Sequence, residues 1–198
     1  LQKLSKKDLE NILQASSDAY YNKNQFIMSD NEYDIVKEYI EKKYPASEEL
    51  KKIGAPVEKN KVSLPFNMPS MDKIKPDTNA VEKWVADYKG PYVLSAKLDG
   101  ISALYSTQGP EPKLYTRGDG SVGQDISYMI PYLRLPKATK DTSVVIRGEL
   151  IMKKKTFEEK YSTKFANARN LVSGIVGTKT IDEDKYRDVD FVAYEVLH

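Results

Sequence analysis

The chain has 198 residues, of which 40% are hydrophobic and 30% are charged, and its 31 basic and 29 acidic residues leave a net charge of +2. This composition is typical of a soluble globular protein. Because the basic and acidic residues nearly balance, the net charge gives no argument for nucleic-acid binding. Because there is no cysteine and the single histidine is His198, disulfides, thiolate metal sites and histidine-based triads are excluded. No apolar run is long enough to span a bilayer and the N-terminus does not resemble a signal peptide, so we expect no membrane association and a cytoplasmic location.

The N-terminal segment predicts two antiparallel helices. Ser5 and Asp8 form a capping pair at the start of the first helix, and Ser29 and Glu32 form a capping box for the second. The second helix ends before Pro45, because the residue that precedes a proline disfavours the helical region. The apolar faces with helical spacing comprise Leu9, Ile12, Leu13, Ser16, Ala19 and Tyr20 in the first helix and Tyr33, Val36, Tyr39 and Ile40 in the second.

Residues 46–65 mix Glu, Lys, Gly and Pro without a period, which predicts a connector. We therefore expect a small helical module over residues 1–48 and a second domain over residues 49–198. Interleaved antiparallel strands and helices make the expected fold class α+β, with hairpin turns at Asp99-Gly100 and Gly109-Pro110. Strands are predicted at 92–96, 101–106, 113–117, 144–152 and 189–197, and helices at 79–89, 122–133, 155–161 and 167–176.

Lys97-Leu98-Asp99-Gly100 lies between two of the predicted strands, which would present a lysine at a tight turn inside a hydrophobic sheet. A lysine there loses hydration, which disfavours its charged form, and a neutral amine is a nucleophile. The alternative is a simple Asp-Gly hairpin turn with the lysine in solvent. Taken alone, the short motif favours that structural alternative.

Further segments change this weighting. They are Thr116 to Gly120, Ile146 to Leu150 and Phe165 to Asn170, with Met68 to Asp72 and Ser29 to Asp34 upstream and Phe191 to Tyr194 downstream. In this order and spacing they resemble the adenylation domain of NAD-dependent DNA ligases, and the resemblance covers nearly the whole chain. It implies a helical module that binds nicotinamide mononucleotide, followed by a nucleotidyltransferase domain of antiparallel sheets with packed helices.

The resemblance implies that Lys97 attacks the α-phosphate of NAD, forms lysyl-AMP and releases nicotinamide mononucleotide. It assigns catalytic roles to Asp99 and Glu149 as well, and both carboxylates are candidate ligands for Mg²⁺. In a strand, Asp99 would share a face with Lys97. Glu149 lies beside apolar neighbours, so its carboxylate needs a polar partner. The resemblance implies that this partner is the ribose of the adenylate, and the alternative is a structural salt bridge with Arg147 or Lys153.

Two groups of residues are expected to bind NAD. On the second helix, two carboxylates and an aromatic ring lie on one side and suit a positively charged ring, although a solvated acidic helix start is the alternative. The resemblance extends this nicotinamide group to Tyr20, Tyr21, Asp30, Tyr33 and Asp34. The adenosine and phosphate group comprises Ser70, Met71, Ser95, Leu98, Arg117, Glu149, Arg169 and Tyr194, in which the two arginines suit phosphate and ribose, and Tyr194 is assigned to adenine stacking.

The chain departs from the family pattern at four positions. Ser95 stands where glutamate is usual, Tyr21 where histidine is usual, Ala168 where proline is usual and Gly177 where arginine is expected. The chain also stops before two later family segments whose lysines bind the α-phosphate, so the second domain is expected to be incomplete at its C-terminal end. Nick sealing by this chain alone is therefore not expected, since charge stabilisation at the reacting phosphate would be lost.

The partners implied are NAD, Mg²⁺ and, for the full-length enzyme, nicked double-stranded DNA, with the chain expected to be a monomer. One alternative function is an ATP-dependent lysine nucleotidyltransferase, either a ligase or a capping enzyme, since Lys-x-Asp-Gly is shared among them. The acidic and aromatic face formed by Asp30, Tyr33 and Asp34 argues against it. The second alternative is an inactive nucleic-acid-binding module that kept the fold, which Ser95 and the missing later segments would explain.

Overall fold

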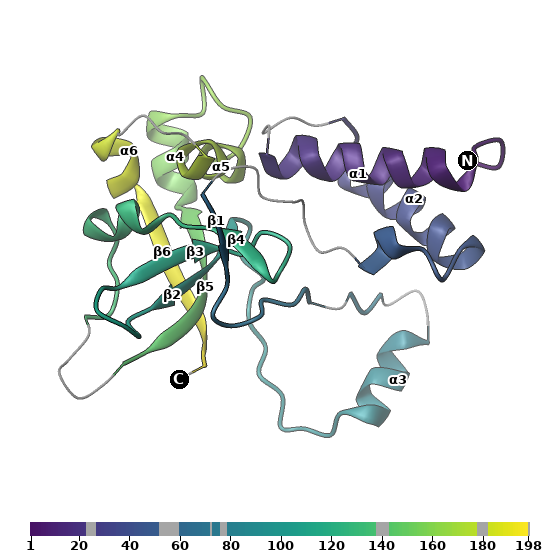
Figure 1. Cartoon of the computed structure of the whole chain (residues 1–198), viewed down its shortest axis with the longest axis horizontal. Coiled ribbons are helices and arrows are strands. Elements are labelled where there is room, and N and C mark those ends of the chain that lie inside the picture. The colour runs from purple at the N-terminus through teal and green to yellow at the C-terminus, as the bar shows by residue number, and fades with distance from the viewer. Residues whose placement is uncertain are drawn as a thin grey trace.

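A pair of N-terminal helices lies beside a sheet domain in the computed structural model (Figure 1). The structure describes residues 1–22, 27–51, 60–71, 73–75, 79–137, 143–177 and 182–197, without the side chains of 20–22, 30, 31 and 51. None of the helices in these ranges has both the length and the apolar character that a bilayer crossing requires. The combination of helices with antiparallel sheets confirms the α+β class.

The two N-terminal helices are α1 (Lys6–Asn22) and α2 (Asp30–Lys43), followed by the short 3-10 helix η1 (Glu48–Lys51). They pack through a separate apolar cluster of buried side chains from both helices, which confirms the predicted helix pair. The fully or nearly fully buried members of this cluster are Leu9, Leu13, Val36 and Ile40. Burial of an aliphatic side chain contributes about 1.5–3 kcal/mol, so the cluster is the main force that joins the two helices.

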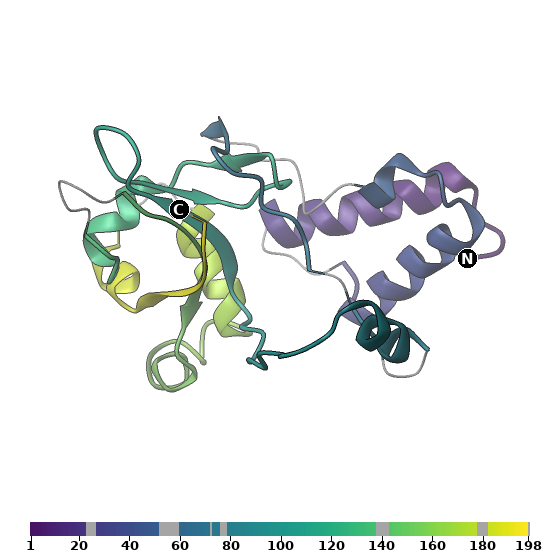
Figure 2. The same ribbon diagram turned by 90° about the horizontal axis from the view of Figure 1, so that it is seen from below.

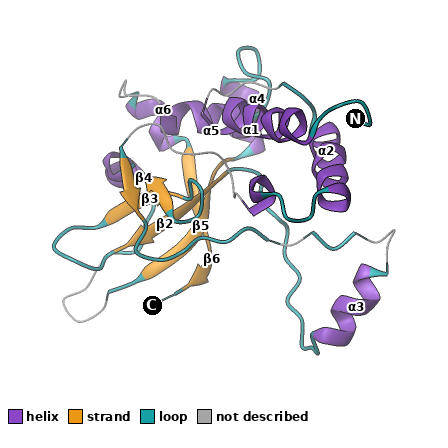
Figure 3. Ribbon diagram, turned by 45° about the vertical axis from the view of Figure 1, so that its right-hand side comes forward, coloured by secondary structure: helices purple, strands orange, loops and turns teal. Residues whose placement is uncertain are grey.

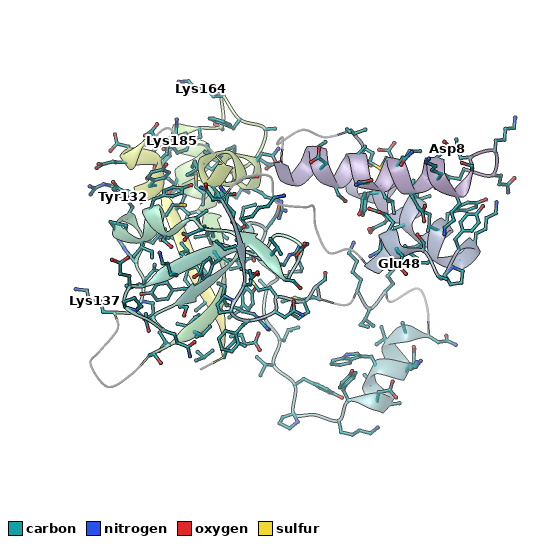
Figure 4. The ribbon with its side chains drawn as sticks, in the orientation of Figure 1. Asp8, Glu48, Tyr132, Lys137, Lys164 and Lys185 are labelled. Atoms are coloured by element: carbon teal, nitrogen blue, oxygen red, sulfur yellow. The ribbon has the colours of Figure 1, made fainter. Side chains whose placement is uncertain are left out.

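Both predicted N-caps are present. The Ser5 backbone N–H donates to Asp8 at 3.0 Å, and the Asp8 backbone N–H donates back to the Ser5 hydroxyl at 3.2 Å. Asp8 lies in the first turn of α1 (Figure 4). Ser29 and Glu32 form the reciprocal capping box of α2, and the helix ends at Lys43 with Tyr44 as its C-cap. Each cap satisfies backbone donors that a helix start otherwise leaves unpaired.

The main sheet has four antiparallel strands in the order β3-β2-β5-β6. Figure 3 shows these strands gathered on one side of the molecule, with helices above them. Three residues of β1 pair with β4 in a separate small sheet. The strands are β1 (Lys61–Ser63), β2 (Ile101–Ser106), β3 (Lys113–Thr116), β4 (Val122–Gln124), β5 (Val145–Met152) and β6 (Val189–Val196), which confirms the predicted strands at 101–106, 113–117, 144–152 and 189–197.

The principal core lies on one face of the main sheet, where four helices pack against it. They are η2 (Ser127–Tyr132), α4 (Lys154–Lys160), α5 (Ala168–Gly177) and α6 (Glu183–Arg187), of which α4 and α5 were predicted and α6 was not. The opposite face has a smaller cluster centred on Met68, Leu104 and Val145. Because only part of this second face is covered by apolar side chains, polar groups of β2 and β5 remain available on it.

The predicted strand at 92–96 is wrong. Residues 91–99 form an extended, unpaired segment, in which Val93 is 96% and Leu94 is 99% exposed. The segment leads from α3 (Ala80–Asp87), a predicted helix with no buried residue, to the start of β2 (Figure 2). Its apolar residues have strand propensity, but a strand also needs a hydrogen-bonding neighbour, and none of the described strands pairs with it.

The turn predictions had different outcomes. Gly109-Pro110 lies in the link between antiparallel β2 and β3, as expected. Asp99-Gly100 does not close a hairpin, because no strand precedes it. The predicted helix at 122–133 is also wrong, since β4 and then η2 occupy this stretch. Pro131 removes a backbone donor there, and Asp125 instead accepts from the Ser127 N–H at 2.9 Å, a local bond that competes with a regular helix.

Candidate active site

Glu149 is the buried centre of the candidate site. It lies on β5 directly opposite Ser102 of β2 in the antiparallel register, and the Ser102 hydroxyl donates to its carboxylate at 2.9 Å. The residue is only 8% exposed. Burial raises the pKa of Glu149 above its ordinary value, while the Ser102 hydrogen bond and then the charges of Arg169, Lys97 and Arg117 oppose that rise.

Three positive groups from separate segments therefore act on one carboxylate. Lys97 comes from the extended segment, Arg117 follows β3 and Arg169 lies in the first turn of α5. The alternative partners considered for Glu149 are engaged elsewhere: Arg147 with Glu195 at 2.6 Å and Lys153 with Asp190 at 3.2 Å. Glu149 is thus not part of a structural salt bridge within its own strand.

Lys97 is exposed, so the expectation of a dehydrated lysine on the face of a core sheet is wrong. The reason is the extended segment before it, which does not join the sheet. Its charge nevertheless favours the ionised form of Glu149, so the ammonium group stays beside the candidate site. The structure brings Lys97 together with the carboxylate and the arginines, but without burial.

The turn that carries Asp99 is fixed by Arg169. One guanidinium nitrogen donates to the backbone carbonyl of Gly100 and lies 3.4 Å from the carboxylate of Asp99. Asp99 is mostly exposed, and the predicted strand face shared with Lys97 does not exist. A Cβ on Gly100 would lie 2.1 Å from the carbonyl oxygen of Leu150, so only glycine permits this approach to β5.

Arg117 opens a tight turn between β3 and β4. Its backbone N–H donates to the Ser102 carbonyl at 3.0 Å. Gly118 and Gly120 have positive φ angles of 56° and 97°, which explains the glycines of this motif. Asp119 accepts from two backbone N–H groups within the turn, at 2.9 and 2.7 Å, so its role here is structural. The turn holds Arg117 close enough for its charge to act on Glu149.

Tyr194 lies on the exposed edge strand β6 and is 46% exposed. Partial burial raises its pKa first and the negative charge of Glu149 raises it further, which places the phenol ring beside the site. Ser70, Met71 and Ser95 are exposed, and Leu98 is half-buried. Among the predicted adenosine residues, the structure therefore brings Arg117, Arg169 and Tyr194 within electrostatic reach of Glu149.

Two side chains of the predicted nicotinamide face of α2 already contact other residues of the chain. The Tyr33 hydroxyl lies 3.0 Å from the Ser17 hydroxyl of α1. Asp34 accepts from Lys73 at 2.8 and 2.9 Å, and Glu38 pairs with Lys75 one turn further along. The side chains of Tyr20, Tyr21 and Asp30 lie outside the described residues. Two ion pairs thus join α2 to the segment that precedes α3.

Two residues of the site were missed from the sequence. Ser102 partners Glu149 only through the register of β2 and β5, and strand register is not visible in a single sequence. Arg147 was considered only as a partner of Glu149. Its spacing from Glu149 puts both side chains on one face of β5, which was the available signal.

The chain resembles known ligases over its full length. A family model for the NAD-dependent DNA ligase adenylation domain matches residues 62–198. The chain is 46% identical over its whole length to a DNA ligase of Acanthamoeba polyphaga mimivirus, of which it covers 32%. It is 31% identical over 94% of its length to a DNA ligase of Fusobacterium nucleatum, covering 31% of that protein, and 34% identical over 80% to one of Clostridioides difficile, covering 27%. It therefore spans about a third of the length of these relatives. With a buried carboxylate among three cations and a family match over most of its residues, the chain belongs to the family of NAD-dependent DNA ligase adenylation domains.

Proposed function

We propose that this chain carries the nucleotide-binding part of an NAD-dependent DNA ligase and that Lys97 becomes adenylated. The Lys97 nitrogen forms a bond to the α-phosphorus of NAD, the bond from phosphorus to the nicotinamide mononucleotide oxygen breaks, and the amine loses a proton. The observation that carries the proposal is the grouping of Lys97, Arg117 and Arg169 around the buried carboxylate of Glu149. In a longer protein, the AMP would then pass to the 5′-phosphate of nicked DNA.

The arginines would stabilise the reacting phosphate. Guanidinium groups offer planar donors for phosphate oxygens, and charge stabilisation is strongest where the donors are already fixed. Arg169 meets this condition through its contact with the Gly100 carbonyl. Because Lys97 is exposed in the free chain, we propose that bound NAD itself covers the amine and excludes water from it.

The adenosine half of NAD would bind over the open surface beside Glu149. Tyr194 would stack on adenine, Glu149 would accept from ribose hydroxyls, and Ser70, Met71, Ser95 and Leu98 would line the site. The half-exposed ring of Tyr194 beside Glu149 supports this arrangement. The helical module, residues 1–48, would bind the nicotinamide half through Tyr20, Tyr21, Asp30, Tyr33 and Asp34, and residues 49–198 would form the adenylation domain.

Mg²⁺ is the proposed metal, with Asp99 and Glu149 as its protein ligands. Carboxylate oxygens suit this hard cation, which commonly keeps several waters and binds substrate phosphates. No group of three or more His, Cys, Asp or Glu side chains that could hold a metal occurs in the described parts of the chain. In the proposed site, Asp99 and Glu149 would supply the protein ligands, substrate phosphate and water would complete the coordination, and the ion would supply charge neutralisation at the phosphate.

Mass spectrometry tests the proposal directly. The chain is incubated with Mg²⁺ and either NAD or ATP, and intact mass with peptide mapping locates any AMP. We expect AMP on Lys97 with NAD only, and none in Lys97→Arg, which keeps the charge but has no nucleophilic amine. Labelling with ATP but not NAD would instead indicate an ATP-dependent nucleotidyltransferase. If neither cofactor labels the chain and calorimetry detects no binding of AMP or nicotinamide mononucleotide, the inactive-module alternative holds.

The nicotinamide assignment needs a separate test. Tyr33→Ala should weaken binding of nicotinamide mononucleotide while AMP binding stays unchanged. Tyr33→Phe is the matched control, because it loses only the hydroxyl that meets Ser17 and keeps the aromatic ring. Equal mononucleotide affinity in Tyr33→Ala and the parent would remove this face from the proposal. Size-exclusion chromatography with light scattering tests the proposed monomer.

A further inference from the structure

We infer that Arg147 is a positioning residue that fixes the Asn67–Met71 segment against β6 and so shapes the adenosine side of the site. The inference rests on the proposed function for its consequence, since that segment and Tyr194 are the proposed adenine contacts. The positioning itself rests on contacts of the free chain. It concerns a residue that touches neither substrate nor cofactor in the proposed mechanism.

Arg147 joins two elements that are distant in the sequence. One terminal nitrogen of its guanidinium donates to the Glu195 carboxylate at 2.6 Å, and the other donates to the backbone carbonyl of Asn67 at 2.6 Å. The Arg147 side chain is only 19% exposed, whereas its two partners lie at the surface. Charge-assisted hydrogen bonds of this length are stronger than neutral ones, and a planar fork can make both at once.

The segment beyond Asn67 is anchored on its other side by the turn after β3. The Met68 N–H donates to the Gly120 carbonyl at 2.8 Å, and Met68 is buried against Leu104 and Val145. Ser70 and Met71 then become exposed at the edge of the site. Arg147 therefore holds the last residue before this anchored methionine, and its contact determines where the exposed residues leave the sheet.

Arg147 also lies at an irregularity of β6 that involves Tyr194. In the β5–β6 register, Arg147 pairs with Glu195 and Gly148 pairs with Ala193, so Tyr194 is an additional residue in a β-bulge. Such bulges redirect a side chain next to functional sites. The pKa of Tyr194 is raised mainly by burial and then by Glu149, and the charge of Arg147 is among those that oppose the rise, so the guanidinium is close to the ring.

Two further observations support positioning rather than general stabilisation. The buried Nε of Arg147 has no hydrogen-bond partner among the described residues. The hydrogen bonds of the two terminal nitrogens therefore determine the orientation of the guanidinium, although its third donor position stays unpaired. A Cβ on Gly148 would lie 2.5 Å from the Phe191 ring and 2.6 Å from the Val192 carbonyl oxygen, so glycine is needed next to Arg147 where the bulge begins. One arginine thus bridges the loop and the bulged strand on either side of the proposed adenine contacts.

The test compares Arg147→Met, Arg147→Lys and Glu195→Gln in the full chain. Hydrogen–deuterium exchange without ligand should show faster exchange in the peptide covering 66–71 for both Arg147 variants. Calorimetry should show AMP bound about tenfold more weakly by Arg147→Met, with nicotinamide mononucleotide affinity unchanged. In single-turnover adenylation of Lys97, the half-saturating NAD concentration should rise by a similar factor while the rate constant at saturating NAD stays within about twofold. Glu195→Gln, which keeps the Asn67 contact, should have the smaller effect on AMP.

Lys153→Met is the matched control, because it also removes an ion pair between the β5 end and β6 but touches no part of the loop. It should leave exchange over 66–71 and AMP affinity unchanged. Unchanged exchange in both Arg147 variants would overturn the inference, as would faster exchange with unaltered AMP affinity. If the parent itself is not adenylated by NAD, the proposed reaction fails, whereas the exchange comparison still decides whether Arg147 positions the segment.

Discussion

Ser102 of β2 donates a 2.9 Å hydrogen bond to the carboxylate of Glu149, its register partner on β5. This bond favours the ionised form, yet burial outweighs it and raises the pKa of Glu149. A buried carboxylate with a raised pKa destabilises the fold when it is ionised, but it can bind hydroxyl groups or a metal. The site therefore contains a group that we expect to be retained for function at some cost to the fold.

Glu149→Gln should separate these two effects. Since the folded pKa lies above the ordinary value of 4.5, this carboxyl favours folding below that pH, and the contribution is lost as pH rises through the folded pKa. Glutamine keeps an acceptor for Ser102 and removes the buried charge. The free energy of unfolding of the variant relative to the parent should thus be higher at pH 7.5 than at pH 4. Urea unfolding at the two pH values measures it.

The same variant should lose activity. We expect adenylation of Lys97 to fall by about 100-fold, the usual scale for loss of one electrostatic contact in an active site. Glu159→Gln, at an exposed position on α4, is the matched surface control and should change stability by less than about 0.5 kcal/mol. A fully active variant, or one whose stability relative to the parent does not rise from pH 4 to pH 7.5, would contradict the role given to Glu149.

Gly100→Ala should destabilise the fold and disturb the lysine turn. The new Cβ would lie 2.1 Å from the Leu150 carbonyl oxygen and 2.8 Å from the Ile151 side chain, so the backbone must move. Overpacking of this kind costs about 1–3 kcal/mol. Gly177→Ala is the control, because no atom of the described residues lies within 4 Å of its new methyl group and alanine favours a helix by up to about 1 kcal/mol. Thermal unfolding should move in opposite directions in the two variants.

Arg169→Lys should reduce adenylation while the fold is retained. Lysine keeps the charge and could replace the single nitrogen that meets the Gly100 carbonyl and Asp99, but it lacks the remaining planar donors that suit phosphate oxygens. We expect the second-order rate constant for labelling by NAD to fall about 10- to 100-fold. Arg187→Lys, on α6 and far exposed, is the matched control and should behave as the parent. Single-turnover labelling measures both, and an unchanged rate in Arg169→Lys would mean that the guanidinium geometry is not used.

Lys73→Ala should strengthen binding of nicotinamide mononucleotide. In the free chain, Asp34 is engaged by Lys73 at 2.8 Å, so a ligand that uses this carboxylate must displace the lysine. Exposed pairs are worth up to about 1 kcal/mol, which corresponds to a gain of roughly two- to fivefold at low salt. Lys37→Ala removes a lysine paired within α2 itself and should have no such effect. Weaker binding by Lys73→Ala would indicate that Lys73 contacts the ligand instead.

Local sequence signals predicted much of the fold. The capping pairs at Ser5 and Ser29 and the apolar spacing between them determine where both N-terminal helices begin, and the structure confirms them. The main-sheet strands were also predicted, because their apolar runs are bounded by turn residues. The short strands β1 and β4 were missed, since three-residue strands carry too little pattern to detect.

The remaining errors have a common physical cause. Tyr92 to Ala96 has strand propensity, but a single sequence does not show whether a hydrogen-bonding neighbour exists. The expected burial of Lys97 depended on that strand and failed with it. Likewise, Ser102 becomes part of the site through strand register rather than through any motif. The strands and helices that carry the candidate residues were therefore largely predictable, whereas the environment of Lys97 depended on long-range pairing.

The extended segment before Lys97 has a practical consequence for digestion of the protein. Tyr92 and Leu94 carry side chains of the kind that chymotrypsin selects, and both stand in an accessible stretch without regular structure. One cut there would separate α3 and everything before it from the piece that contains Lys97 and the whole main sheet. The rate of chymotrypsin cleavage in this segment therefore reports whether a ligand orders it, because an ordered segment is cleaved more slowly.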